Sequence, residues 1–255
     1  ALPDGKELKI TLEGDKVKLN AGKGRYTLGT LPAQDFPSLE AGHGGQHLRL
    51  PGSVLARLIE KVQFAMAQQD VRYYLNGMQL EIKPGRIRAV ATDGHRLALC
   101  EADFEKDSII DLQMLIPRKA VIELGRLLAE HSGDIELEAG TSHFRVQLGD
   151  TRFVSKLIDG KFPDYERVMP SDESNYLLAD RSVLRQALVR TSILSNEKYR
   201  GIRFQLENNL VRLEANNPEQ DEALEEVEVE YSGEAFTVGF NVSYLLDVLG
   251  VLSDD

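Results

Sequence analysis

An internal repeat is the feature that most constrains how this chain can fold. The sequence has 255 residues, and segments of its first half recur in its second half at a spacing of about 125 residues. Single positions repeat as well, since Gly22 aligns with Gly149 and Phe36 aligns with Phe162. Four pairs of segments carry the repeat: residues 8–12 with 135–139, 53–55 with 182–184, 88–93 with 212–217, and 118–128 with 242–252. Four matches at nearly one spacing are hard to attribute to chance, so we expect copies of one domain.

The repeat also predicts where these copies begin and end. Residues 44–170 form a complete unit, with a helix, a run of strands, a second helix and further strands. Residues 1–43 match only the end of that unit, and residues 171–255 match only its beginning. We therefore expect the C-terminal remainder of a first domain, a complete second domain and the N-terminal part of a third. A period of this length argues against a solenoid, whose repeats have about 20–50 residues.

Each unit is expected to have an α+β fold with antiparallel sheets. Alternating apolar and acidic residues, as in residues 134–138, predict strands with one solvent-exposed face. Helix starts are indicated by Pro117 and Asp180. Hairpin turns are expected at Pro84-Gly85 and at Asn208-Asn209. Helical patterns cover residues 53–67, 117–130, 181–194 and 242–252.

Composition narrows the functional classes. The chain has 30 Lys and Arg residues against 41 Asp and Glu residues, a net charge of −11, which by itself argues against a nucleic-acid partner. Its apolar runs are only a few residues long, far short of the about 20 that a membrane span needs. The single cysteine, Cys100, excludes an internal disulfide and fits a reducing cytoplasm.

The distribution of charge along the chain weakens the argument against a nucleic-acid partner. The three expected helices at 53–67, 117–130 and 181–194 carry far more basic than acidic side chains, although the chain as a whole is acidic. A basic helix face within an acidic protein suits a polyanion that is contacted through its phosphates, without base readout. The alternative is that these are ordinary solvated helix faces. The basic residues are Arg57, Lys61, Arg118, Lys119, Arg126, Arg181, Arg185 and Arg190.

The segment Thr92-Asp-Gly-His-Arg-Leu97 looks most like a catalytic motif. Asp93 and His95 could act as an orienting carboxylate and a base in a hydrolase. However, the two residues lie too close on one strand to pair productively, and Asp-Gly favours a turn. A structural or binding turn is therefore the preferred interpretation. The remaining histidines, His43, His47, His131 and His143, lack metal-ligand spacing, so we expect neither a metal nor a cofactor.

Paired tyrosines next to an arginine form a second candidate site. Tyr73 and Tyr74 follow Arg72, and such rings can stack on bases or contact phosphates. In an expected strand, alternation would place one ring in the core and the other outside it. One ring can lie in the core while the other contacts nucleic acid, so the two interpretations are compatible.

Six motifs carry a resemblance to a known family over the whole chain. The sequence closely resembles the bacterial beta sliding clamps, the beta subunits of DNA polymerase III. The motifs occur in the family's order: Gln69-Asp-Val-Arg-Tyr-Tyr-Leu-Asn-Gly77, Ala91-Thr-Asp-Gly-His-Arg-Leu97, Phe162-Pro-Asp-Tyr165, Ile193-Leu-Ser-Asn-Glu-Lys198, Asn216-Asn-Pro-Glu-Gln220 and Gly239-Phe-Asn-Val-Ser-Tyr244.

The resemblance implies a non-enzymatic processivity factor in the cytoplasm. Family members have three similar domains per subunit, with helices lining the inside of a ring and antiparallel sheets outside. Two subunits close head to tail around duplex DNA, which they bind without sequence preference. Short linear peptides of the polymerase catalytic subunit, the clamp loader and other clients occupy a hydrophobic cleft. A protein-interaction scaffold that does not bind DNA remains an alternative, and a hydrolase using Asp93 and His95 is a more distant one.

The resemblance also implies three groups of site residues. The peptide-binding cleft would comprise Leu75, Thr92, Gly94, His95, Arg96, Leu97, Pro163, Arg167, Val168, Asn241 and Tyr244. DNA would be contacted by the eight basic helix residues together with Gln69, Arg72, Tyr73 and Tyr74. The contact between subunits would involve Tyr26 and Leu28 on one side and Ile193 and Leu194 on the other. The chain departs from the family in lacking most of the first domain and the C-terminal tail that completes the cleft.

Overall fold

The computed structural model describes residues 7–36, 45–104, 111–170 and 176–253. The chain forms two compact units, Ala1–Ala41 and Gly42–Asp255, and each is described separately. The domain boundaries expected at 43/44 and 170/171 involve residues outside the described ranges, so they stay a prediction. Within the described residues, no helix is long and apolar enough to cross a membrane.

The first unit is a three-stranded antiparallel sheet. Its strands β1 (Leu8–Glu13), β2 (Lys16–Ala21) and β3 (Gly24–Gly29) pair in chain order, and the 3-10 helix η1 (Ala33–Asp35) follows. Each hairpin has a glycine with positive φ, +59° at Gly14 and +58° at Gly22. A side chain would strain these positions, so glycine permits both tight turns.

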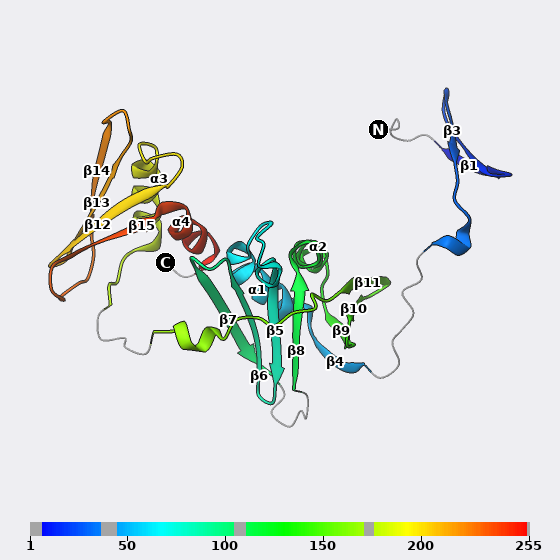
Figure 1. The fold of residues 1–255 in the computed structure, drawn as a ribbon, viewed down its shortest axis with the longest axis horizontal. Coiled ribbons are helices and arrows are strands. Elements are labelled where there is room, and N and C mark those ends of the chain that lie inside the picture. The colour runs from blue at the N-terminus through cyan, green and yellow to red at the C-terminus, as the bar shows by residue number, and fades with distance from the viewer. Residues whose placement is uncertain (1–6, 37–44, 105–110, 171–175, 254–255) are drawn as a thin grey trace. The chain divides into compact units, whose positions relative to one another are not determined.

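The first half of the second unit contains two four-stranded antiparallel sheets and two helices. One sheet has the order β7-β6-β5-β8, and the other has the order β11-β10-β9-β4 (Figure 1). The elements in chain order are β4 (Gln46–Pro51), α1 (Gly52–Val62), η2 (Gln63–Ala65), η3 (Tyr73–Leu75), β5 (Gly77–Lys83), β6 (Arg86–Thr92), β7 (Leu97–Asp103), β8 (Leu112–Pro117), α2 (Arg118–Ala129), β9 (Asp134–Ala139), β10 (His143–Leu148), β11 (Thr151–Lys156) and η4 (Tyr165–Val168). The α+β class is confirmed.

The second half repeats the start of the first. Its sheet order, β14-β13-β12-β15, corresponds strand for strand to β7-β6-β5-β8. Its elements are α3 (Arg181–Ser192), β12 (Gly201–Glu207), β13 (Leu210–Asn216), β14 (Glu222–Glu228), β15 (Phe236–Asn241) and α4 (Val242–Val251). Both ends of β5, β6 and β8 lie 124 residues before those of β12, β13 and β15. The sequence repeat is therefore a repeat of strand topology.

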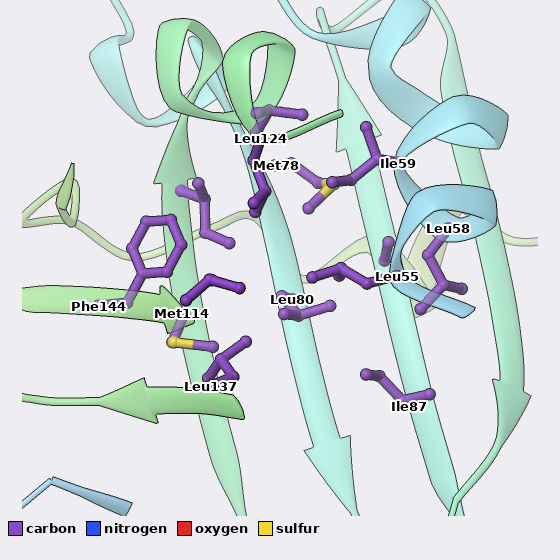
Figure 2. Packing of buried hydrophobic residues seen from close by; sticks show 14 of the residues in the cluster. Leu55, Leu58, Ile59, Met78, Leu80, Ile87, Met114, Leu124, Leu137 and Phe144 are labelled. Carbon is purple, nitrogen blue, oxygen red and sulfur yellow. The ribbon is translucent and has the colours of Figure 1, made fainter. Parts of the chain in front are cut away.

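One large core joins the helices to both sheets of the first half, and a smaller cluster of Val90, Leu115, Phe162 and Tyr165 lies apart from it. Helix α1 buries Leu55, Leu58 and Ile59, whose spacing places them on one helical face. Leu55, Leu58 and Ile59 belong to one cluster with Leu80 of β5, Ile87 of β6 and Phe144 of β10, and Figure 2 shows these side chains between the helices and the strands. Full burial of each such side chain contributes about 1.5–3 kcal/mol. This packing fixes the sheet edges and turns that carry the candidate site.

Two local expectations were wrong. The first helix ends at Val62 rather than at residue 67, because Val62 has φ −126° and a 3-10 turn follows. The segment at Tyr73 and Tyr74 is the 3-10 turn η3 rather than a strand. There the Asn76 side-chain amide donates to the Asp70 carbonyl at 2.8 Å, and the Asp70 N–H donates to Asn76 Oδ1 at 2.9 Å. These bonds close a compact loop in place of a sheet ladder.

Candidate functional site

The candidate cleft is a cavity of about 410 Å³ between the β6–β7 turn, η3 and η4. Eight of the eleven residues expected in the cleft line it, although they come from three separate segments. Its lining residues are Arg72, Tyr74, Leu75, Thr92, Gly94, His95, Arg96, Leu97, Pro163, Asp164, Tyr165 and Val168. The fold of the β7-β6-β5-β8 sheet thus brings these segments together.

The β6–β7 turn is held by its own side chains. Asp93 Oδ1 accepts hydrogen bonds from the backbone N–H groups of His95 at 2.9 Å and Arg96 at 3.0 Å. Thr92 Oγ1 donates to the Arg96 carbonyl at 2.6 Å, and accepts from the Gly94 N–H at 3.1 Å. The Asp93 carboxylate therefore stabilises the turn, as its sequence suggested. It orients no imidazole, so nothing in this geometry favours a hydrolase.

Arg72 forms one wall of the cleft, although it was expected to contact DNA. Its Nε and Nη2 atoms donate to the two carboxylate oxygens of Asp70 at 3.0 and 2.8 Å. These hydrogen bonds lower the pKa of Asp70 to about 2, because they stabilise the charged carboxylate. A Cβ atom at Gly94, where φ is +88°, would lie 2.9 Å from Arg72 Nη1. Glycine is therefore favoured by the positive φ of the turn, and any larger residue would displace the Arg72 guanidinium.

The floor of the cleft is apolar. Leu75 is only 2% exposed, while Val168 at the mouth is 70% exposed. Tyr165 closes one side, and its hydroxyl donates to Glu81 Oε2 at 3.1 Å and accepts from Arg88 Nη1 at 3.0 Å. Burial raises the pKa of this hydroxyl, which stays protonated and acts as a donor. Apolar anchors with a charged rim suit a peptide with large apolar side chains.

Sequence reasoning missed four of the lining residues. Asp164 and Tyr165 belong to the quoted Phe-Pro-Asp-Tyr motif, of which only Pro163 was assigned to the cleft. Arg72 and Tyr74 were assigned to DNA instead. The signal for all four was present in motifs already identified, but the sequence alone does not show which side chains share a cavity.

Three expected cleft residues do not line the cavity. Arg167 is exposed, and its Nε forms an ion pair with Asp164 at 2.7 Å. Asn241 caps α4, because its Oδ1 accepts from the Ser243 N–H at 2.9 Å. Tyr244 contacts a lining residue instead, since its ring centroid is 4.4 Å from the guanidinium carbon of Arg96.

The eight basic helix residues differ in their partners. Lys61, Arg118 and Arg181 donate to backbone carbonyls of Val251, Met66 and Leu249. Arg126 pairs with Glu123 at 2.8 Å, and Arg190 pairs with Glu225 through bonds of 2.6 and 2.9 Å. The remaining three, Arg57, Lys119 and Arg185, are exposed and have no hydrogen-bond or ion-pair partner among the described residues. These three are the best placed to meet an external anion.

The other residues expected at DNA divide between two places, since Gln69 lies beside α2 whereas Arg72 and Tyr74 line the cleft. Gln69, Arg118 and Lys119 line a second cavity of about 570 Å³. Tyr73 is exposed, and its ring lies 5.8 Å from that of Tyr74 in an edge-to-face arrangement. Tyr74 is half-buried at the cleft, so the two tyrosines face different surroundings.

The residues expected at a subunit contact are largely exposed. Tyr26 and Leu28 protrude from β3 of the first unit, and Ile193 follows α3 in the second unit with 74% of its surface exposed. Leu194 is half-buried. Among the described residues, no group of three or more His, Cys, Asp or Glu side chains is arranged to hold a metal ion.

Comparison with known proteins identifies the family. Residues 49–164 match the DNA polymerase III beta subunit, central domain, and residues 166–255 match its C-terminal domain. The beta sliding clamp of Pseudomonas aeruginosa is 53% identical over 255 residues, which cover 100% of this chain and 70% of that protein. The beta sliding clamp of Escherichia coli K12 is 47% identical over 251 residues, covering 98% of this chain and 68% of that protein.

Solved structures agree. The crystal structure of the DNA polymerase III subunit beta from Pseudomonas aeruginosa has a TM-score of 0.91 and 54% identity, and the match covers 99% of this chain and 69% of that chain. A sliding clamp from the same organism bound to griselimycin has a TM-score of 0.90, with 54% identity and the same two coverages. The chain therefore belongs to the family of DNA polymerase III beta subunits, the beta sliding clamps.

Proposed function

We propose that the chain acts as a DNA sliding clamp, a processivity factor that encircles duplex DNA and tethers the replicative polymerase. A beta sliding clamp has no catalytic activity, and the protein is not an enzyme. Tethering raises the effective concentration of the polymerase at the primer end, so a weak contact with each partner is sufficient.

The observation that carries this proposal is the preformed cleft. Leu75 and Leu97 provide apolar contacts, and Arg72 and Arg96 form a charged rim around them. An extended peptide can place its apolar side chains on the floor while its backbone meets the rim. We assign this cleft to short linear peptides of the polymerase catalytic subunit, the clamp loader and other clients.

The helices supply the proposed DNA-facing surface. Phosphate contacts carry no sequence information, which is what a protein that slides along DNA requires. Arg57, Lys119 and Arg185 are the strongest candidates, because no hydrogen bond or ion pair with a described residue holds their side chains, although Lys119 lies near enough to Glu123 to lower the pKa of that carboxyl. Gln69 and Tyr73 extend the same surface in our proposal.

Ring closure is proposed to use residues at opposite ends of the chain. Tyr26 and Leu28 of one subunit would meet Ile193 and Leu194 of the next in a head-to-tail homodimer. This assembly follows the division into residues 1–43, 44–170 and 171–255, with the helices inside the ring and the sheets outside. We place the protein in the cytoplasm, where its DNA and polymerase partners are.

Measurement of peptide binding tests the cleft. We expect Leu97→Ala to weaken the binding of a fluorescein-labelled polymerase peptide by more than 1 kcal/mol, which raises Kd at least about fivefold. Anchor side chains carry most of the binding energy of such contacts. Leu224→Ala is the matched control, since Leu224 is an exposed leucine on β14 that does not line the cavity. Equal affinity of the Leu97→Ala variant and the wild-type protein in fluorescence anisotropy would refute the assignment.

A further inference from the structure

The Arg96 guanidinium is the most highly connected group at the cleft. Its Nε donates to Asp93 Oδ2 at 3.1 Å, its Nη1 donates to Asp247 Oδ2 at 2.5 Å, and its Nη2 donates to the Phe64 carbonyl at 2.7 Å. The guanidinium carbon Cζ also lies over two aromatic rings, 5.3 Å from the ring centroid of Phe64 and 4.4 Å from that of Tyr244. Five separate contacts thus fix one flexible side chain.

These contacts come from both halves of the second unit. Asp93 lies in the β6–β7 turn and Phe64 lies in η2, both in the first half, whereas Tyr244 and Asp247 belong to α4 of the second half. Tyr244 and Asp247 are three residues apart, so they share one face of that helix. Neither lines the cleft cavity. They reach it only through Arg96.

The Asp93 carboxylate cannot take over the contact that Asp247 makes with Arg96. Asp93 Oδ1 already accepts two backbone N–H groups, so Asp93 offers Arg96 only its second oxygen, at the Nε end of the guanidinium. The opposite end of the planar group is therefore oriented by Asp247 and the Phe64 carbonyl. A guanidinium has five N–H donors, and these three bonds leave two for a ligand.

The position of α4 is also fixed at its C-terminal end. Asn241 caps its first turn, and Lys61 of α1 donates to the Val251 carbonyl in its last turn. A cation at this end also interacts favourably with the helix dipole. Helix α4 therefore presents Tyr244 and Asp247 to Arg96 from a docked position.

We propose that Asp247 is a positioning residue for peptide binding, which acts by holding the Arg96 guanidinium in the orientation that receives the client backbone. The inference rests on the proposed function of the cleft. It also implies that binding and docking are coupled, because any peptide that contacts Arg96 in this orientation stabilises the contact between Arg96 and α4. The two free donors match a backbone carbonyl or a carboxylate of the bound peptide.

The test uses the whole chain and a fluorescein-labelled polymerase peptide. Asp247→Asn keeps the size of the side chain but removes its charge, and we expect peptide affinity to fall about tenfold. Asp247→Glu restores the charge and should recover part of that loss. Glu226→Gln is the matched control, because it removes a comparable ion pair, with Arg212 at 2.8 Å, at a residue that does not line the cleft. It should bind the peptide as the wild-type protein does.

A second readout separates positioning from general damage. The Arg96 Nε–Hε signal in ¹⁵N NMR should be sharp in the wild-type protein and shift on addition of peptide, and it should broaden in Asp247→Asn while the thermal transition stays unchanged. The inference would be overturned, with the proposed function of the cleft intact, if Asp247→Asn bound the peptide with wild-type affinity. The same follows if Asp247→Asn and Asp247→Glu lost equal peptide affinity. If the wild-type protein does not bind the peptide, or Leu97→Ala binds it normally, the proposed function of the cleft fails and the inference fails with it.

Discussion

At the scale of single residues, two arginines flank the cleft, and each is oriented by carboxylates outside the apolar floor. Arg72 is held by Asp70, and Arg96 is held by Asp93 and Asp247. Because a guanidinium donates from a rigid plane, pairing with a carboxylate sets its direction as well as its position. The charged rim is thereby organised before a ligand arrives, which lowers the entropy cost of binding.

The Asp70–Arg72 contact gives a prediction about pH. The pKa of Asp70 is lowered from 3.8 to about 2 by Arg72. Since the folded value lies below the ordinary one, the contact contributes fully above pH 3.8 and is lost as the pH falls through about 2. We expect the ¹³C signal of the Asp70 carboxyl group to titrate with a midpoint near pH 2 in NMR.

The Arg72 Nε–Hε signal provides the control for this titration. It should move together with the Asp70 signal in the wild-type protein and stay constant over the same range in Asp70→Asn. A midpoint at or above 3.8 would contradict the ion pair.

The local conformation of a motif could be predicted from sequence, but contacts between distant segments could not. Thr92 and Asp93 form the turn that the Asp-Gly pair indicated. Arg72 was assigned to DNA because the resemblance to the family implies it, and nothing local shows that Arg72 lies against Gly94, 22 positions along the chain. Asp247 gave no signal, since an acidic residue on an amphipathic helix is ordinary until its partner 151 residues away is known.

At the scale of secondary structure, the helices of the two halves begin differently. Helices α1 and α2 follow Pro51 and Pro117 and have no side-chain cap. Helix α3 has a true N-cap, because Asp180 Oδ1 accepts from the Val183 N–H at 2.8 Å. Proline pre-sets the backbone before the first turn, whereas an aspartate satisfies a free N–H group and complements the helix dipole.

The Asp180 cap gives a prediction about stability. We expect Asp180→Ala to lower the free energy of unfolding by about 1 kcal/mol, because it leaves a first-turn N–H group without its acceptor. Urea denaturation followed by circular dichroism measures this loss. Ser182→Ala is the matched control, since Ser182 is exposed in the same turn, and it should change the stability by less than about 0.5 kcal/mol. Equal stability of Asp180→Ala and the wild-type protein would show that the cap does not contribute.

Element types could be predicted from periodicity, but their ends depended on tertiary contacts. The apolar spacing of Leu55, Leu58 and Ile59 predicts α1 correctly. The pattern continues past Val62, and only the structure shows that Ala65 and Met66 turn away from the helix into their own buried positions. The η3 turn depends on the amide of Asn76 bonding back to Asp70, which alternation of residue types cannot reveal.

At the scale of the whole molecule, the repeat predicted the topology because each copy repeats its register. Strand β2 and strand β10 differ by 127 residues at both ends, as do β3 and β11. The partners of the charged residues do not repeat in this way. Arg190 is joined to Glu225 on β14, and this pairing lowers the pKa of Glu225. A count of basic residues on helices therefore does not show which of them already have a carboxylate partner.

This difference between paired and partner-free cations yields the last prediction. We expect the combined variant Arg57→Gln, Lys119→Gln and Arg185→Gln to weaken binding of a duplex DNA and to make it less dependent on salt. Each phosphate contact contributes about −0.9 to the slope of log affinity against log salt, so loss of three contacts reduces the slope by about 2 to 3. Fluorescence anisotropy with a labelled duplex, measured across a series of salt concentrations, gives the slope directly.

The matched control changes the net charge by the same amount, but it removes the cations from strands instead of helices. Arg49→Gln, Arg152→Gln and Arg203→Gln together remove three exposed cations from β4, β11 and β12. If the helix surface faces DNA, the control should keep the wild-type slope, and both variants should bind the polymerase peptide normally, because none of the six residues lines the cleft. Equal slopes for the two variants would mean that net charge alone governs DNA binding. Arg49 and Arg203 form ion pairs with Asp134 and Glu214 at 3.0 and 3.2 Å. In a chain with a net charge of −11, a larger effect of the helix variant must therefore come from the location and pairing of the cations rather than from net charge.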